Sequence, residues 1–427
     1  MDIGFIYKKF SEAGSISTDT RKIIPGSIFF ALRGERFNGN EFAAQALDQG
    51  AAWVVMDDAS YLPTKNYTLV PDVLVCLQEL ARHHRSTLTI PVIGLTGSNG
   101  KTTSKELVNA VLSRKFRTLA TQGNLNNHIG VPLTILSITQ ETELAIIEMG
   151  ANHLQEISLL CSIARPTHGF ITNIGKAHIG TFGGFENIIR GKSELYQHLL
   201  SEKGVVFINS SNSILSQMAH RFKEPVMYPG PSDFIHVELL ESQPYLICCA
   251  DGRPSFRTNL TGAYNFENIA VALCVGKYFG VPMKEAEQAV TSYLPSNMRS
   301  QFVERGTNRI ILDAYNANPT SMEAAIQNLA SMTAPNKIAV LGDMYELGEE
   351  TEKEHRAVGE QLSRSGLQKI FLCGPLMASA KITCPDALHF NDRESLAAYL
   401  EKNPISNAVV LIKASRGMGL EKLLERL

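Results

Sequence analysis

The chain has little excess charge and no long apolar run. These two absences argue against a nucleic-acid-binding protein and against a membrane-spanning one. Its 427 residues carry 40 Lys and Arg against 42 Asp and Glu, and the basic residues form no block. We therefore expect no nucleic-acid partner, because such proteins concentrate positive charge on one face. No stretch is apolar over the length of a membrane-spanning helix, and the N-terminus lacks the layout of a signal peptide. A soluble protein without a membrane partner is expected.

Cysteine is sparse and shows no pairing pattern. The seven Cys residues are odd in number and form no C-x-x-C. They fit neither a disulfide framework nor a structural zinc site, and reduced thiols predict a cytoplasmic protein. At this length the chain should form two to four domains, each large enough to bury a core.

The most informative stretch that is present is a glycine-bearing turn between a strand and a helix. β-Branched residues lead from Pro91 towards the turn, and an apolar stripe at helical spacing follows between Leu107 and Leu112. The glycines let backbone N–H groups approach a phosphate, and a lysine and a threonine begin the helix. This phosphate loop consists of Thr96, Gly97, Ser98, Asn99, Gly100, Lys101, Thr102 and Thr103.

The loop departs from the general pattern G-x-x-x-x-G-K-[ST] at Leu95, which stands where the first glycine belongs. What remains resembles the nucleotide loop of the Mur ligases, ATP-dependent enzymes that extend the peptide of peptidoglycan precursors. The resemblance covers essentially the whole chain, and within the family it points to the ligases that add D-alanyl-D-alanine. The further matching segments are residues 123–132, 172–178, 183–195, 262–268, 298–301, 313–322, 341–348 and 413–418.

We expect an α/β protein of three domains. Residues 1–85 predict a small α/β unit with strands at 28–32 and 53–56 and a helix at 71–84. Residues 86–298 alternate strand and helix, with buried strands at 91–96, 144–148 and 169–173, and predict a P-loop ATPase-like domain with a mostly parallel sheet. Residues 299–427 predict a Rossmann-like domain with strands near 309–313, 337–341, 369–373 and 408–413.

Polar residues stand at or beyond the strand ends of the middle domain, where open α/β sheets bind ligands. Glu148 follows four apolar strand residues. An unpaired carboxylate is costly to bury there, so Mg²⁺ near the loop is its expected partner, with a helix cap as the alternative. His178 and Lys192 lie further along the chain. Residue type alone would make such a histidine structural and such a lysine exposed.

The family resemblance assigns roles that spacing does not. Lys101 would hold the β- and γ-phosphates of ATP, Thr102 and Glu148 would bind one Mg²⁺, and His178 would bind a second. Lys192 matches a lysine that carries a carbamate formed from CO₂. Further positions implied to contact ATP are Asn265 and Asn268 near the adenine, Arg299 at the phosphates, and Asp313 and Asn316 from the third domain.

The resemblance also implies two substrate sites. The segment with Ser17, Thr18 and Arg21, together with Arg33, resembles the part that grips a uridine-diphosphate sugar, where arginines form forked bonds to pyrophosphate. A polar turn is the alternative. The asparagine-rich stretch that contains Asn124 and Asn127 is a further candidate for substrate contact.

The incoming dipeptide carboxylate has its own candidates, Lys413, Ser415 and Arg416, which follow a buried strand. A basic loop that only caps the strand is the alternative. The implied reaction joins D-alanyl-D-alanine to UDP-N-acetylmuramoyl-tripeptide, with ATP and two Mg²⁺ ions, in a monomer.

Three other functions are alternatives to this reaction. A folylpolyglutamate synthase is expected to read Gly-Lys-Gly-Ser in its loop, where this chain has Gly100 to Thr103. A Mur ligase that adds diaminopimelate or lysine should carry Asp-Asn-Pro, which does not occur here, and it remains the best alternative. A regulatory GTPase would need Asn-Lys-x-Asp, whereas Asn336-Lys337 is followed by Ile-Ala. Short linkers near 85 and 298, with no sign of a large apolar surface between domains, predict relative domain movement.

Overall fold

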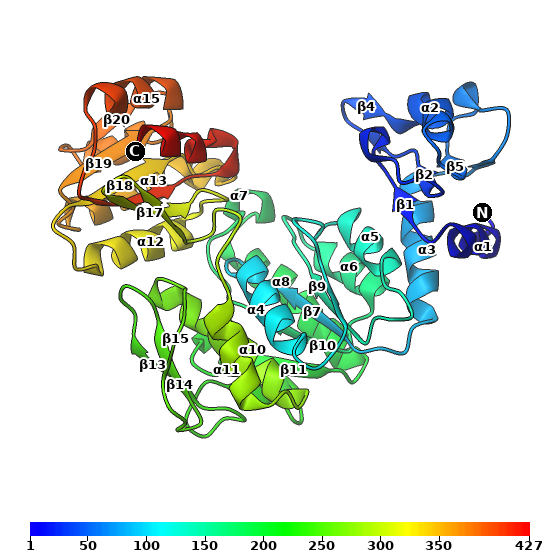
Figure 1. Ribbon diagram of the computed structural model, residues 1–427, viewed down its shortest axis with the longest axis horizontal. Helices are drawn as coiled ribbons and strands as arrows, with labels where there is room; N and C mark the ends of the chain where they lie inside the picture. Colours follow the sequence, from blue (N-terminus) through cyan, green and yellow to red (C-terminus); the bar gives the residue numbers. More distant parts are fainter.

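The computed structural model describes all 427 residues and folds them into three α/β domains (Figure 1). The N-terminal and C-terminal domains lie at the two ends of the view, and each adjoins the middle domain. The expected fold class is confirmed: the first two domains are built on parallel sheets and the third on a mixed sheet. None of the helices combines the length and the apolar character needed to cross a membrane.

The N-terminal domain contains a four-stranded parallel sheet in the order β1-β2-β5-β6. The strand at 53–56 is as predicted, but the one expected to reach Leu32 ends at Phe30, because the chain then turns into the hairpin of β3 and β4. The elements are α1 (Ile3–Ala13), β1 (Ile16–Ser17), β2 (Ile28–Phe30), β3 (Arg33–Gly34), β4 (Phe37–Asn38), α2 (Ala43–Asp48), β5 (Trp53–Met56), β6 (Tyr67–Leu69) and α3 (Val73–Ser86).

The last helix of this domain is packed on the middle domain. One cluster of buried apolar side chains runs without a break from Phe10 and Leu77 to Ile135 and Leu160. The Arg85 guanidinium adds hydrogen bonds to the carbonyl oxygens of two residues at the end of a middle-domain helix, at 2.8 and 3.0 Å. The expectation of no large apolar surface between domains is therefore wrong at this junction. Joint burial of apolar area favours one fixed arrangement of the first two domains.

The middle domain has a six-stranded parallel sheet in the order β12-β11-β10-β7-β9-β8. The elements that build and cover it are β7 (Val92–Thr96), α4 (Lys101–Leu112), β8 (Thr118–Ala120), α5 (Gly130–Leu136), β9 (Leu144–Glu148), α6 (Glu156–Ala164), β10 (His168–Ile171), α7 (Ile179–Phe182), α8 (Phe185–Ser201), β11 (Val205–Asn209), α9 (Ser213–Met218), β12 (Val226–Tyr228), α10 (Phe266–Tyr278) and α11 (Met283–Ser292). A small antiparallel sheet of β13 (Val237–Glu241), β14 (Ile247–Ala250) and β15 (Phe256–Arg257) was not predicted.

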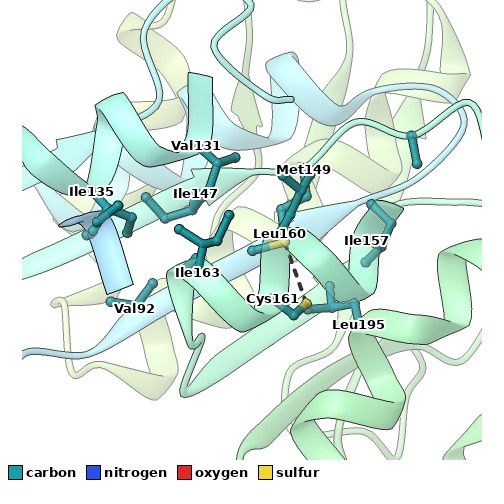
Figure 2. Close-up of a cluster of buried hydrophobic side chains, with 14 of the residues drawn as sticks. Val92, Val131, Ile135, Ile147, Met149, Ile157, Leu160, Cys161, Ile163 and Leu195 are labelled. Atoms are coloured by element: carbon teal, nitrogen blue, oxygen red, sulfur yellow. Dashed lines mark hydrogen bonds between the residues drawn. The ribbon is translucent and has the colours of Figure 1, made fainter. Parts of the chain in front are cut away.

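The neighbouring strands β7 and β9 are buried along their whole length, as their continuous apolar runs predicted. Figure 2 shows the side chains that cover one face, from β9, α5, α6 and α8, including Ile147, Ile135 and Leu195. The Cys161 thiol points to the Met149 sulfur, 3.8 Å away. This packing fixes the carboxyl ends of β7 and β9, from which the phosphate loop and Glu148 emerge.

The C-terminal domain has a six-stranded sheet in the order β16-β17-β21-β18-β19-β20, in which only the edge strand β16 is antiparallel. Four of its strands, β17, β18, β19 and β21, agree with the predicted Rossmann-like series to within one residue at each end, whereas the edge strands β16 and β20 were not predicted. The elements are β16 (Gln301–Arg305), β17 (Asn308–Asp313), α12 (Pro319–Ser331), β18 (Lys337–Gly342), α13 (Thr351–Ser363), β19 (Lys369–Cys373), α14 (Ala378–Thr383), β20 (Leu388–Phe390), α15 (Arg393–Lys402) and β21 (Val409–Lys413).

Candidate active site between the middle and C-terminal domains

A cleft of about 1040 Å³ lies between the middle and C-terminal domains. Its walls bring together most of the residues that the sequence singled out, from segments as far apart in the chain as Ser98 and Arg416. The predicted residues that line it are Ser98, Asn99, Gly100, Lys101, Thr102, Thr103, Asn124, Asn127, Glu148, His178, Asn265, Asn268, Arg299, Asp313, Asn316, Lys413, Ser415 and Arg416. Thr96 and Gly97, the first two residues of the phosphate loop, do not line the cleft, and Lys192 is buried behind its wall.

The phosphate loop is held from beneath by the residues that follow β10. The Asn173 side chain accepts from the Asn99 N–H at 2.9 Å, and the Thr172 hydroxyl donates to the Asn99 carbonyl at 2.6 Å. Gly97 has a φ of 149°, and a Cβ there would lie 1.9 Å from the Thr172 hydroxyl. The predicted strand to residue 173 therefore ends at Ile171, because Thr172 and Asn173 bond to the loop instead of continuing the sheet.

The Lys101 ammonium curls back over the loop and donates to the carbonyl oxygens of Gly97, at 2.7 Å, and Ser98, at 3.3 Å. Burial lowers the pKa of Lys101 to about 8, while the charge of Glu148 acts in the opposite direction and that of Arg299 lowers it further. A lysine so placed at the first turn of α4 presents its charge to an anion bound by the loop.

The Glu148 carboxylate is fixed on one side and free on the other. Its Oε1 atom accepts a hydrogen bond from Asn126 Nδ2 at 2.8 Å. The backbone N–H of Glu148 donates to the Thr121 hydroxyl at 2.9 Å. The Oε2 atom is buried and has no hydrogen-bond partner. Because an orphaned buried carboxylate oxygen is costly, this atom is suited to a cation in the cleft. No cluster of three or more His, Cys, Asp or Glu side chains converges into a self-sufficient metal cage.

His178 lies at the start of α7 in the left-handed region, with a φ of 57°. Its Nδ1 atom is 2.5 Å from the Glu346 Oε2 atom of the C-terminal domain, a contact that becomes an ion pair when the imidazole is protonated. The contact with His178 lowers the pKa of Glu346. His178 is thus poised at the boundary between the two domains.

Lys192 is almost completely buried in α8, with 1% of its surface exposed. Its Nζ atom donates to the carbonyl oxygen of Ala151, a cleft residue, at 3.1 Å and lies 5.2 Å from the Phe182 ring centre. Burial, with the positive charge of Lys101 second, holds the pKa of Lys192 well below its usual value. The side chain is therefore directed to the cleft wall without a carboxylate to pair with.

Asn265 and Asn268 form a chain of side-chain hydrogen bonds behind the loop. Asn268 Nδ2 donates to Asn265 Oδ1 at 2.9 Å, and the Ser104 hydroxyl donates to Asn268 Oδ1 at 2.7 Å. A Cβ at Gly100, which has a φ of 77°, would lie 2.5 Å from Asn268 Oδ1. The glycine is required because the amide supports the loop at such close range.

The C-terminal wall is organised by an ion pair at the ends of two neighbouring strands. Lys413, on β21, places its Nζ atom 2.6 Å from Asp313 Oδ2 on β17 and 3.1 Å from the Asn316 carbonyl oxygen. The Ser415 hydroxyl accepts from the Tyr345 N–H at 2.9 Å. Of the three residues suggested for a dipeptide carboxylate, Lys413 and Ser415 are therefore engaged within the domain, and Arg416 is exposed.

The predicted nucleotide-sugar residues lie in the N-terminal domain, outside the cleft. Ser17 is buried and shares a hydrogen bond with Ser27, and Thr18 is half-buried beside it. Arg21 pairs with Asp19 at 2.7 Å, and Arg33 pairs with Asp57 at 2.8 Å. In the cleft itself, Asn127 accepts from the Ile129 and Gly130 N–H groups at the start of α5.

Sequence analysis missed several cleft residues that tertiary contacts reveal. Asn126, Asn173 and Glu346 position predicted residues, and Tyr315 lies beside two arginines. Asn318 Nδ2 donates to Asn99 Oδ1 at 2.7 Å and joins the C-terminal domain to the phosphate loop. All five are in or beside motifs that the sequence already marked. No local signal separates them from their neighbours.

The cleft is closed at its rim by further contacts between the two domains. The Lys176 Nζ atom lies 2.6 Å from Glu354 Oε1, and the backbone N–H of Lys176 donates to the Thr320 hydroxyl at 3.0 Å. Nearby, the Gly180 N–H donates to the Glu346 carbonyl oxygen at 3.3 Å. Figure 1 shows α7 reaching up to the C-terminal domain at this point. The structure therefore describes a docked arrangement of these domains.

Comparison with known families matches three Mur ligase domains in sequence order. The Mur ligase family catalytic domain matches residues 12–85, the Mur ligase middle domain matches residues 95–276, and the Mur ligase glutamate ligase domain matches residues 298–416.

Full-length relatives and solved structures agree with this match. The UDP-N-acetylmuramoyl-tripeptide--D-alanyl-D-alanine ligase of Bacillus subtilis (strain 168) is 36% identical, over 96% of this chain and 92% of its own. The enzyme of the same name from Escherichia coli (strain K12) is 32% identical, over 97% and 93%. A crystal structure of MurF from Acinetobacter baumannii has a TM-score of 0.87 and 31% identity, over 96% and 92%. MurF from Thermotoga maritima, solved with ADP, has a TM-score of 0.85 and 27% identity, over 100% and 98%.

Proposed function

The chain belongs to the Mur ligase family, and we propose that it joins D-alanyl-D-alanine to the terminal carboxylate of UDP-N-acetylmuramoyl-tripeptide at the expense of ATP. This proposal rests on one observation: the phosphate loop, a carboxylate oxygen without a hydrogen-bond partner and arginines without an ion pair all line the same cleft. Relatives that span nearly the whole chain carry this activity in their names. The cleft is complete within one chain, which supports action as a monomer. We place the reaction in the cytoplasm, where ATP is available.

The proposed chemistry follows from the low reactivity of a carboxylate. A tripeptide carboxylate oxygen attacks the γ-phosphorus of ATP, a P–O bond forms, and the bond to the bridging oxygen breaks so that ADP leaves with the electron pair. The dipeptide amine then attacks the acyl carbon and loses a proton, and phosphate leaves. The products are ADP, phosphate and the pentapeptide precursor. Because water competes for an acyl phosphate, both steps require a closed cleft.

Lys101 and Arg299 are the residues that we assign to the phosphates. Lys101 stands at the N-terminus of α4, where backbone N–H groups already favour an anion. Its present bonds to loop carbonyls are of the kind that a phosphate oxygen would replace. Asn265 and Asn268 would support the loop beside the nucleotide, and Asp313 with Asn316 would contact ATP from the C-terminal domain.

The residues present fit a magnesium ion held jointly with ATP. The orphaned Glu148 Oε2 atom and the Thr102 hydroxyl at the loop would supply protein ligands, and phosphates and water the rest, because Mg²⁺ is commonly held by one or two carboxylates plus substrate phosphates. His178 would contact a second ion. When bound, these ions would neutralise charge on the phosphates during transfer.

We further propose that Lys192 carries a carbamate. A buried ammonium without a carboxylate partner is costly, and the uncharged amine is the form that attacks CO₂. In that step the nitrogen bonds to the carbon and loses a proton, which leaves an anion directed to the cleft wall. The anion would complement the magnesium site.

The N-terminal domain would bind the uridine-diphosphate part of the substrate through Ser17, Thr18, Arg21 and Arg33. For the two arginines, that role requires exchange of their present carboxylate partners for pyrophosphate oxygens. Asn124 and Asn127 would contact the peptide where it enters the cleft. Arg416, with Lys413 and Ser415 behind it, would receive the dipeptide carboxylate.

One assay tests the proposed reaction against its alternatives. ADP release is measured with each UDP-muramoyl peptide crossed against single amino acids and D-alanyl-D-alanine. We expect turnover only when the tripeptide nucleotide and the dipeptide are present together. Efficient addition of diaminopimelate or lysine to the dipeptide precursor would instead identify the ligase for the third residue. Turnover with a folate and glutamate would identify a folylpolyglutamate synthase.

A further inference from the structure

Two arginines from different segments converge on one tyrosine in the cleft. The Arg299 guanidinium carbon lies 3.8 Å from the centre of the Tyr315 ring, and that of Arg416 lies 5.1 Å from it. Arg299 belongs to the link between the domains, whereas Arg416 follows β21 and Tyr315 follows β17. All three side chains line the cleft. One aromatic ring thus contacts a cation from the interdomain link and a cation from the C-terminal sheet.

Neither guanidinium is neutralised. Neither arginine forms an ion pair with a carboxylate, and the buried Nε atom of Arg299 has no hydrogen-bond partner. Two cations beside one ring repel each other, so the stacking on the aromatic face is what holds them in place. An anion with two or more negative charges would relieve this repulsion better than a single carboxylate, which one forked guanidinium satisfies.

On the basis of the proposed function, we propose that Tyr315 is a positioning residue that holds Arg299 and Arg416 towards the phosphoryl group passing from ATP to the tripeptide carboxylate. For Arg416, this assignment replaces the one to the dipeptide carboxylate. The phosphoryl group is the most highly charged part of the reacting substrates, and it must lie near the loop lysine. Arg299 lies close enough to Lys101 for its charge to act on that side chain. Neither Tyr315 nor the pairing of the two arginines was singled out by the sequence.

The ring matters more than the hydroxyl in this role. The Tyr315 oxygen is 3.5 Å from Arg416 Nη1, at the outer limit of a hydrogen bond, whereas Arg299 lies directly over the ring. Phenylalanine keeps the aromatic face, and leucine removes it but keeps an apolar side chain. A matched control exists outside the cleft, where Arg257 stacks on Tyr245 at 4.4 Å.

The kinetic test compares Tyr315→Leu, Tyr315→Phe and the control Tyr245→Leu. We expect kcat of Tyr315→Leu to fall by about tenfold or more, with KM for ATP and for the dipeptide within about twofold of wild type. Tyr315→Phe should keep most of kcat, and Tyr245→Leu should keep all kinetic constants. A Tyr315→Leu variant with wild-type kcat would overturn the proposal. A rise in KM for the dipeptide alone would instead assign the arginines to its carboxylate.

A crystal structure of Tyr315→Leu separates this proposal from the proposed reaction, because it needs no substrate. We expect the Arg299 side chain to leave its present position when the ring is removed. If neither guanidinium group moves, the positioning role of Tyr315 is wrong, whatever the reaction is. Failure of the wild-type protein to ligate D-alanyl-D-alanine would contradict the proposed function. The positions of the two arginines in the variant would still test the role of Tyr315.

Discussion

Gly180 and Gly348 bring the backbones of two domains into direct contact. A Cβ atom on Gly180 would lie 2.6 Å from the Gly348 nitrogen, and one on Gly348 would lie 3.1 Å from the Gly180 Cα. Gly180 is on α7 of the middle domain, and Gly348 begins a short 3-10 helix two residues after Glu346. The docked position of the C-terminal domain therefore depends on a missing side chain at a point adjacent to the His178–Glu346 contact.

Gly180→Ala should impair docking without harming the middle domain. Gly180 occupies a short helix at a φ that does not need glycine, so alanine fits the undocked domain. In the docked state its methyl group would clash with backbone, which yields less readily than a flexible side chain. We expect kcat to fall by about tenfold or more. Solution scattering should show a smaller ligand-induced decrease in radius of gyration than wild type shows with an ATP analogue and UDP-muramoyl-tripeptide.

The control for this substitution is Glu186→Ala, on the exposed first turn of the neighbouring helix α8. It should contract like wild type. Suppose that the radius of gyration of the wild type does not change with ligands and that ATP is hydrolysed quickly without the amine acceptor. The cleft would then be preformed and accessible to water. Such a result would exclude closure of the cleft on ligand binding.

Lys192→Ala should lose nearly all ligase activity, because it removes the group that would carry the carbamate. Short carboxylates such as acetate or formate should restore part of the turnover by supplying an anion in the vacated space. Lys192→Arg tests whether the carbamate itself is needed, because arginine keeps a long cationic side chain that does not form a carbamate. Ordinary turnover in Lys192→Ala would remove the residue from the site.

Lys413→Met should destabilise the C-terminal domain. The Lys413 side chain is 2% exposed and its partner Asp313 is 15% exposed, so the substitution leaves a largely buried carboxylate without its cation. We expect a loss of about 3 kcal/mol in the free energy of unfolding, measured by urea titration. Adding Asp313→Asn should recover part of this stability but not the ligase activity. A single variant as stable as wild type would show that the pair contributes nothing to the fold.

His168 should make the middle domain sensitive to acid. Its ring packs against Phe279 at 5.0 Å and Phe207 at 6.4 Å, and burial lowers its pKa to about 4. Below its ordinary pKa of 6.5, the unfolded chain binds a proton that the folded chain does not accept until about pH 4, so stability falls as the pH decreases through this window. At about pH 5 the loss should be about 2 kcal/mol.

Urea titrations at about pH 7 and about pH 5 measure this effect. His168→Phe keeps an aromatic ring in the cluster but removes the titrating group, so it should lose less stability than wild type between the two pH values. A variant with the same pH dependence as wild type would assign the acid sensitivity to other groups.

The fold and the phosphate loop were predictable because their signals are local. Continuous apolar runs identified β7 and β9, and glycines next to Lys101 marked the turn before α4. Strand ends were less predictable. The strand expected to include Asn173 stops at Ile171, since the residues after it bond to Asn99 of the loop, 73 and 74 positions earlier in the chain.

The sequence by itself determined which residues carry charge and which can approach a phosphate, since residue type and glycine conformations are local properties. Only the tertiary structure decided which charges remain free. Lys413 is paired with Asp313 across two strands, whereas Arg299 and Arg416 meet at Tyr315 without a carboxylate. Such pairings depend on Coulomb interactions and stacking over a few ångströms between segments about 100 residues apart, and the order of strands in the sheet sets those distances.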